Sequence, residues 1–186
     1  MDLAKALREG PTFVRNAEDS LQRNITNPDL LYLWDNQVAV IDSYLADTEN
    51  LNGEADELTE LRGRLRELKK QLERKVMEFE AQQEGEEVPE EPPAEELVED
   101  FKAVAGDIVA MGDEALGQKI KDVSQLATLE DPRDLINGFL ADTEPYKGDK
   151  ELAQVRDEVR ARKEQLDARI RSITEEWRQK DLAESR

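Results

Sequence analysis

The chain has 186 residues and contains neither cysteine nor histidine. These two absences exclude a thiolate nucleophile, a disulfide, and any acid–base or zinc site built on those residues. With 45 acidic and 26 basic residues the formal net charge is −19, and aromatic residues make up only 5% of the chain, which argues against a large β-sheet protein.

Two helices are predicted in the first part of the chain. Gly10 is expected to interrupt the backbone, and Pro11 to occupy the first position of a helix whose apolar residues continue to Ile25. Asn27 is a good N-cap for the second helix, because its side chain can accept a backbone hydrogen bond. The turn residues 50–53 are expected to follow the end of that helix.

A third helix is predicted from about Glu54 to Gln82, and it has the most regular apolar pattern of the chain. Its leucines recur at spacings of three and four residues, as along the seam of a coiled coil. At 1.5 Å per residue this helix would be roughly 43 Å long, longer than the second helix beside it. The apolar residues at its far end, Val76 and Phe79, therefore need cover from elsewhere.

An acidic linker is predicted at residues 84–96. Residues 80–100 carry 10 acids and no base, and Pro89, Pro92 and Pro93 lie among the glutamates. Proline lacks an amide donor and the glutamates repel one another, so we expect an extended segment with no core of its own.

The second half of the chain repeats the pattern of the first at a distance of 95 residues. The pentapeptide at 45–49 recurs at 140–144, and apolar residues before it match as well, including Ile41 with Ile136 and Val40 with Leu135. In the third helix the apolar residues match at a distance of 94 residues. The sequence therefore predicts an all-α fold. It is expected to be a tandem duplication of a three-helix unit with a long, coiled-coil-like third helix, with repeats at 1–83 and 97–186.

The repeated sequence Ala-Asp-Thr-Glu has two interpretations. Its acids could be two equivalent docking or cation-binding points, at Asp47 and Glu49 in one copy and at Asp142 and Glu144 in the other. Alternatively, the motif ends the second helix and hydrogen-bonds to the turn that follows. We favour the structural interpretation, because identity between two copies does not by itself indicate a shared task.

Basic residues concentrate on the third helix of the first repeat. The candidate stripe consists of Arg62, Arg66, Lys69, Lys70 and Arg74. Such a stripe could bind nucleic acid, contact the acidic linker, or be a solvated helix face. A solvated face is favoured, because the chain is strongly acidic and no aromatic residues are interleaved with the bases.

The aromatic residues Trp34, Tyr44, Phe139, Tyr146 and Trp177 are expected mainly in the core. The core is favoured for Trp177 too, although cover from its own unit should run out at the far ends of the two third helices. Phe79, Ile173 and Trp177 are therefore candidate contacts for a partner.

Enzyme activity is not expected, because the sequence contains no nucleophile elbow, phosphate loop or metal-ligand spacing. No catalytic residue, cofactor or metal is therefore predicted. We expect a structural or adaptor protein that bridges protein partners, with two copies of one partner among the options, within a larger assembly such as a viral (phage) particle or scaffold. The alternative is an acidic inhibitor or nucleic-acid mimic that occupies a basic site on an enzyme.

A cytoplasmic or virion location is expected, because no signal peptide is recognisable. No apolar run approaches the ~20 residues that a membrane span needs, so no membrane partner is predicted. Nucleic acid is an unlikely partner of so acidic a chain.

Overall fold

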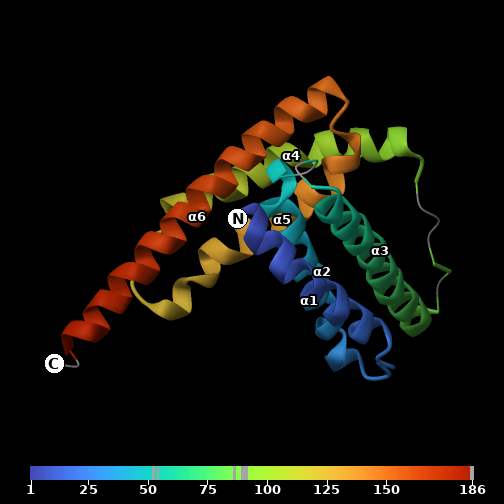
Figure 1. Cartoon of the computed structure of the whole chain (residues 1–186), viewed down its shortest axis with the longest axis horizontal. Helices are drawn as coiled ribbons and strands as arrows, with labels where there is room; N and C mark the ends of the chain where they lie inside the picture. The colour runs from blue at the N-terminus through green and yellow to red at the C-terminus, as the bar shows by residue number, and fades with distance from the viewer. Residues whose placement is uncertain (52, 54, 86, 89–91, 185–186) are drawn as a thin grey trace. The chain divides into compact units, whose positions relative to one another are not determined.

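The computed structural model describes residues 1–51, 53, 55–85, 87–88 and 92–184. These residues form six α-helices and four short 3₁₀ turns and contain no strand, which confirms the predicted all-α class (Figure 1). The chain divides into two compact units, Met1–Glu91 and Pro92–Arg186. Each unit is described by itself below.

The first unit contains α1 (Leu3–Leu21), η1 (Pro28–Leu30), α2 (Tyr32–Asp47), η2 (Glu49–Leu51) and α3 (Asp56–Glu84). Asp2 caps α1 by accepting a hydrogen bond from the Lys5 amide at 2.8 Å. Asn27 is a cap as predicted, since its Oδ1 accepts from the Asp29 amide at 3.0 Å. It caps the 3₁₀ turn η1, however, and α2 begins only at Tyr32.

The predicted break at Gly10 is wrong, because α1 continues through Gly10 and Pro11. Proline removes one helical donor, but Pro11 is exposed, where water can satisfy the carbonyl that loses its partner. Glycine is needed at position 10 for another reason, because the side chains of Tyr44 and Leu61 lie too close to the backbone there to leave room for a Cβ atom. A Cβ atom at this position would lie 2.7 Å from the hydroxyl oxygen of Tyr44 and 2.9 Å from Cδ1 of Leu61.

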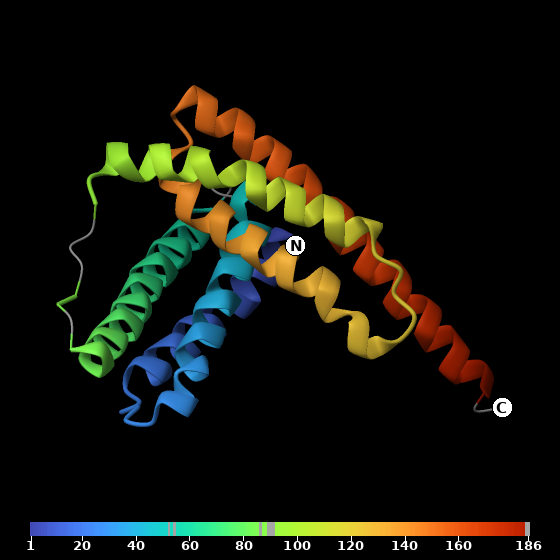
Figure 2. The same ribbon diagram turned by 180° about the vertical axis from the view of Figure 1, so that it is seen from behind.

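The second unit contains α4 (Ala94–Gly117), η3 (Val123–Gln125), α5 (Ala127–Thr143), η4 (Glu144–Tyr146) and α6 (Lys150–Glu184), in the same order of elements as the first (Figure 2). With 35 residues α6 is the longest helix described, against 24 in α4 and 17 in α5. Its C-terminal end runs on past both of them (Figure 2).

The predicted linker is shorter than 84–96. Glu84 is the last residue of α3, and Gly85 ends that helix in the left-handed conformation, with φ of 74°. Residues 94–96 form the first turn of α4, where Glu95 and Glu96 are stabilised by the positive end of the helix. Residues 86 and 89–91 lie outside the described residues.

In each unit the long last helix packs against both earlier helices, α3 against α1 and α2, and α6 against α4 and α5. The leucines of the predicted seam therefore find cover inside the unit. The apolar residues with no exposed surface are Ala6, Ala17, Ile41, Leu58, Leu65 and Leu72 in the first unit and Leu129, Ile136, Leu152, Val159 and Leu166 in the second.

Three of the predicted core aromatics are buried, namely Trp34, Tyr44 and Phe139. The indole Nε1 of Trp34 donates to the Ser20 carbonyl at 3.0 Å, and the Tyr44 hydroxyl donates to the Ala6 carbonyl at 2.9 Å. Burial raises the pKa of Tyr44 above its usual value, which keeps the phenol neutral and able to donate.

Candidate interaction surface

A buried arginine caps the C-terminal end of α2. Arg62 on α3 is fully buried, and its Nη1 donates to the Leu45 carbonyl at 2.7 Å and to Oγ1 of Thr48. The Thr48 hydroxyl in turn donates to the Tyr44 carbonyl at 2.7 Å. The C-terminal carbonyls of a helix lack intrahelical donors and carry partial negative charge, so a guanidinium is a suitable cap for them.

The second unit contains the same set of hydrogen bonds. Arg156 on α6 is 2% exposed and donates to the Leu140 carbonyl at 2.8 Å and to Oγ1 of Thr143. The Thr143 hydroxyl donates to the Phe139 carbonyl at 2.6 Å. The leucine and the threonine of the repeated pentapeptide thus have a structural role in both units.

The five candidate bases of α3 do not form one stripe. Arg62 and Lys69 are buried, Arg66 is half-buried, and Lys70 and Arg74 are exposed. The interpretation of this stretch as a solvated face is wrong for Arg62 and Lys69. Their spacing of seven residues places both on the side of α3 that carries the buried leucines.

Lys69 lies in a buried ion pair. Its Nζ is 2.7 Å from Oδ1 of Asp42 on α2 and 3.3 Å from Oε1 of Glu73 one turn further along α3. Arg74, by contrast, forms an exposed pair with Glu78 at 3.0 Å. A continuous basic surface for nucleic acid is therefore not formed by these five residues.

The acidic candidates lie at the junction between the middle and last helices of each unit. Asp47, Glu49 and Asp142 are half-buried, and Glu144 is buried. Glu144 therefore offers little surface to a partner. Asp47 and Asp142 remain accessible in part, at the C-terminal ends of α2 and α5.

The candidate contacts at the ends of the long helices differ from one another. Phe79 is only 9% exposed and belongs to the core of the first unit, so it offers little surface to a partner. Ile173 and Trp177 are half-buried on α6. The second unit leaves these two side chains partly uncovered.

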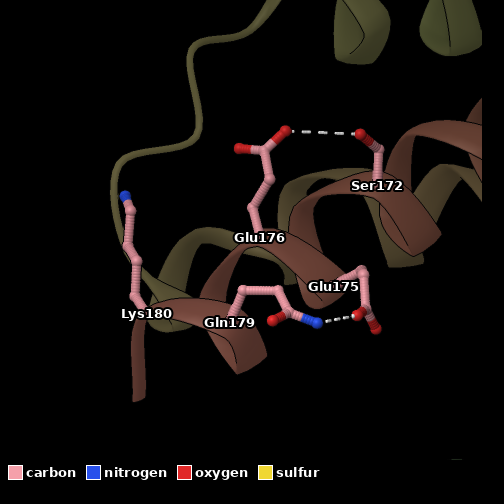
Figure 3. A pocket seen from close by; sticks show the side chains of 5 residues that line it. All are labelled: Ser172, Glu175, Glu176, Gln179 and Lys180. Atoms are coloured by element: carbon pink, nitrogen blue, oxygen red, sulfur yellow. Dashed lines mark hydrogen bonds between the residues drawn. The ribbon is translucent and has the colours of Figure 1, made fainter. Parts of the chain in front are cut away.

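A shallow hollow lies near the same end of α6. It is lined by Ser172, Glu175, Glu176, Gln179 and Lys180, all of them exposed (Figure 3). Two hydrogen bonds join these side chains along the helix. The Ser172 hydroxyl donates to Glu176 at 3.4 Å, and Nε2 of Gln179 donates to Glu175 at 2.6 Å. Because one helix supplies every lining residue, the hollow does not enclose a ligand.

The middle helices carry a feature that sequence reasoning missed. Val40 on α2 is 42% exposed and Leu135 on α5 is 45% exposed, at positions 95 residues apart. At helical spacings each belongs to a row along the outside of its helix, which we call the outer stripe. The outer stripe of α2 consists of Asn36, Val40, Ser43 and Asp47, and that of α5 of Asp131, Leu135, Gly138 and Asp142.

The two outer stripes match in exposure as well as in position. The first two residues of each stripe are exposed and the last two are half-buried. Each places one large apolar side chain between polar or acidic residues and beside a small residue, Ser43 or Gly138. The alignment of Val40 with Leu135 was visible in the sequence, but their exposure was not.

Comparisons with known proteins add no functional information. No family model matches the chain, and searches of curated proteins and of solved structures gave no match. Within the described residues, no group of three or more acidic side chains could hold a metal ion. Among the helices of the same residues, none has both the length and the apolar character to cross a membrane.

Proposed function

We propose that this chain is a non-catalytic adaptor that holds two copies of one protein partner, one at the outer stripe of α2 and one at that of α5. The observation that carries this proposal is the match between the two stripes. Val40 and Leu135 are exposed to a similar degree and have similar polar and small neighbours.

The reasoning depends on the difference between buried and exposed positions. Buried residues at corresponding positions resemble each other because both units fold in the same way. Exposed residues are not held to one type by a core, and most substitutions there change stability little. The match between Val40 and Leu135 at corresponding exposed positions is therefore the basis on which we propose a shared binding task.

A tandem duplication of the three-helix unit is part of the proposal. Support comes from the two buried arginines, Arg62 and Arg156, which donate to the matching leucine carbonyl and threonine hydroxyl in each unit. The coiled-coil-like character of the third helices stays a prediction, as does a place in a viral particle or another large assembly.

The test is the stoichiometry of complexes formed by the full-length chain. A tagged chain is crosslinked in cells of its source, purified, and weighed intact by native mass spectrometry. We expect two copies of one partner per chain, with crosslinks near both outer stripes. A single partner crosslinked to the acidic residues 80–100 and released by moderate salt would instead support the inhibitor or mimic alternative.

A further inference from the structure

One side of α4 carries two large apolar side chains that are exposed. Val104 is 44% exposed and Met111 is 45% exposed. Three exposed acids, Asp100, Asp107 and Glu114, alternate with them at spacings of four and three residues, so all five lie along one side of the helix. We call these five residues the α4 row. The row spans about 21 Å at 1.5 Å per residue, or about four turns.

The three acids of the α4 row have no partner among the described residues. No side-chain hydrogen bond or ion pair there involves Asp100, Asp107 or Glu114. The one base of α4, Lys102, is engaged elsewhere, and its Nζ donates to Oε1 of Glu99 at 3.0 Å. The α4 row therefore presents unpaired negative charge on both sides of each apolar side chain.

The corresponding positions of the first unit have a different character. At a distance of 95 residues, Val104 and Met111 correspond to Glu9 and Asn16 of α1, and Asp100 corresponds to Lys5. Both units contain the same order of helices, so the three-helix fold does not require apolar residues at these positions. The exposed apolar pair is thus a property of the second unit alone.

The flank of the α4 row suits a helix as the occupant. Ala103 and Ala110 directly precede the two apolar residues, and both are exposed. Small side chains beside an apolar row let the ridges of a second helix settle close to the backbone. The corresponding residues of α1, Arg8 and Arg15, are exposed as well, and they would obstruct a helix and repel a basic one.

The charges of the α4 row disfavour a second copy of the chain as the occupant. Two such rows laid against each other would place carboxylates either opposite carboxylates or against apolar side chains. The first arrangement is repulsive, and the second takes unpaired charge out of water. The net charge of −19 adds repulsion between whole chains. A helix that alternates apolar and basic side chains along one side meets none of these penalties.

We propose that the α4 row binds one basic amphipathic helix of a partner protein. Apolar side chains of that helix pack on Val104 and Met111, and its lysines or arginines pair with Asp100, Asp107 and Glu114. The site lies in the second unit only and uses no residue of the outer stripes. It therefore goes beyond the adaptor function proposed above and does not depend on it.

The test uses the full-length chain and a synthetic helix of about three heptads, in which leucine and lysine alternate along one side as apolar and acidic residues do in the α4 row. Calorimetric titration is performed in about 0.15 M salt, where the Debye length is ~8 Å. We expect one peptide bound per chain. The double variant Val104→Ser, Met111→Ser should weaken binding about tenfold or more, and Asp107→Asn up to about fivefold.

The matched controls are Met77→Ser and Glu60→Gln, which remove an exposed apolar side chain and an exposed acid of α3. Both should leave the affinity for the peptide unchanged, and all variants should keep the helical circular dichroism of the parent. The double variant Ala103→Arg, Ala110→Arg introduces the arginines found in α1. It should weaken binding strongly without loss of helix, because arginine is also a good helix former.

Three results would overturn the inference. Equal binding by the parent and by the double variant at Val104 and Met111 would place the peptide elsewhere on the chain. Equal binding of a peptide of the same composition, with its lysines moved out of the row by one position, would mean unspecific attraction to an acidic protein. In sedimentation of the chain without peptide, a dimer that the same double variant dissociates would assign the α4 row to a second copy.

Discussion

The close contact at Gly10 allows a double-mutant test of the packing between α1 and α2. A Cβ atom at Gly10 would lie 2.7 Å from the Tyr44 hydroxyl and 2.9 Å from the end of Leu61. Overpacking of this kind costs about 1–3 kcal/mol, while alanine gains ~1 kcal/mol over glycine within a helix. We therefore expect Gly10→Ala to lower the free energy of unfolding by up to about 2 kcal/mol.

The partner substitution is Tyr44→Phe. Alone it should cost about 1 kcal/mol, because the hydrogen bond to the Ala6 carbonyl is lost. In the double variant the methyl group of the alanine takes the place of the hydroxyl. It should therefore be more stable than the sum of the single effects predicts, with a coupling of about 1–2 kcal/mol. The second unit already has the residues of the double variant at the corresponding positions, alanine at Ala105 and phenylalanine at Phe139.

The measurement is urea unfolding followed by circular dichroism for the parent, both single variants and the double variant. Gly63→Ala is the matched control, since it also lies inside a helix and a Cβ atom there would meet nothing within 4 Å. It should stabilise the chain by up to ~1 kcal/mol. Additive effects of Gly10→Ala and Tyr44→Phe, or a stabilising Gly10→Ala, would refute the steric reasoning.

Three further predictions concern the buried polar contacts and the pH dependence. Arg62→Met and Arg156→Met should each lower the unfolding free energy by about 2–4 kcal/mol in urea melts, because a carbonyl and a threonine hydroxyl stay buried without their donor; an unchanged midpoint would contradict this role. Asn137→Asp should not destabilise the chain although the position is buried, because Asn137 corresponds to Asp42 and Lys163, 94 residues after Lys69, corresponds to the lysine that pairs with it; a large fall in melting temperature would show that the second unit cannot form this pair. The pKa of Asp149 is lowered by the hydrogen bond from the Leu152 amide and by Lys102, so its contribution is present at neutral pH and is lost as the pH falls below about 4; Asp149→Ala should therefore reduce the urea midpoint at pH 7 and have little effect in acid.

Much of the fold could be predicted because it follows from local patterns. The apolar spacing of α3 located that helix to within two residues at each end, and Asn27 identified the turn before α2. The break at Gly10 was predicted from a local rule for glycine and proline. The reason for Gly10 is a contact with Tyr44, 34 positions further along the chain, which no local rule contains.

The candidate surface was harder to predict because charge was taken as a sign of exposure. Arg62 and Lys69 were assigned to a solvated face, although their spacing of seven residues follows the buried side of α3. Val40 is the opposite case, an apolar residue that is exposed. It directly precedes the buried Ile41, and an apolar run on a helix does not reveal which of its residues lies outside.

The exchange of Gly10 and Tyr44 in one unit for Ala105 and Phe139 in the other also bears on how the chain folds. Two units with matching apolar patterns in one polypeptide can pair helices across units, a typical misfolding route of repeat proteins. If α4 took the place of α1 against α2, the methyl group of Ala105 would meet the Tyr44 hydroxyl at about the 2.7 Å found for a Cβ atom at Gly10. If α1 took the place of α4 against α5, neither a methyl group nor a hydroxyl would fill the space between Gly10 and Phe139, and a void would remain. Each exchanged pairing would therefore carry a steric or a cavity cost that pairing within a unit avoids.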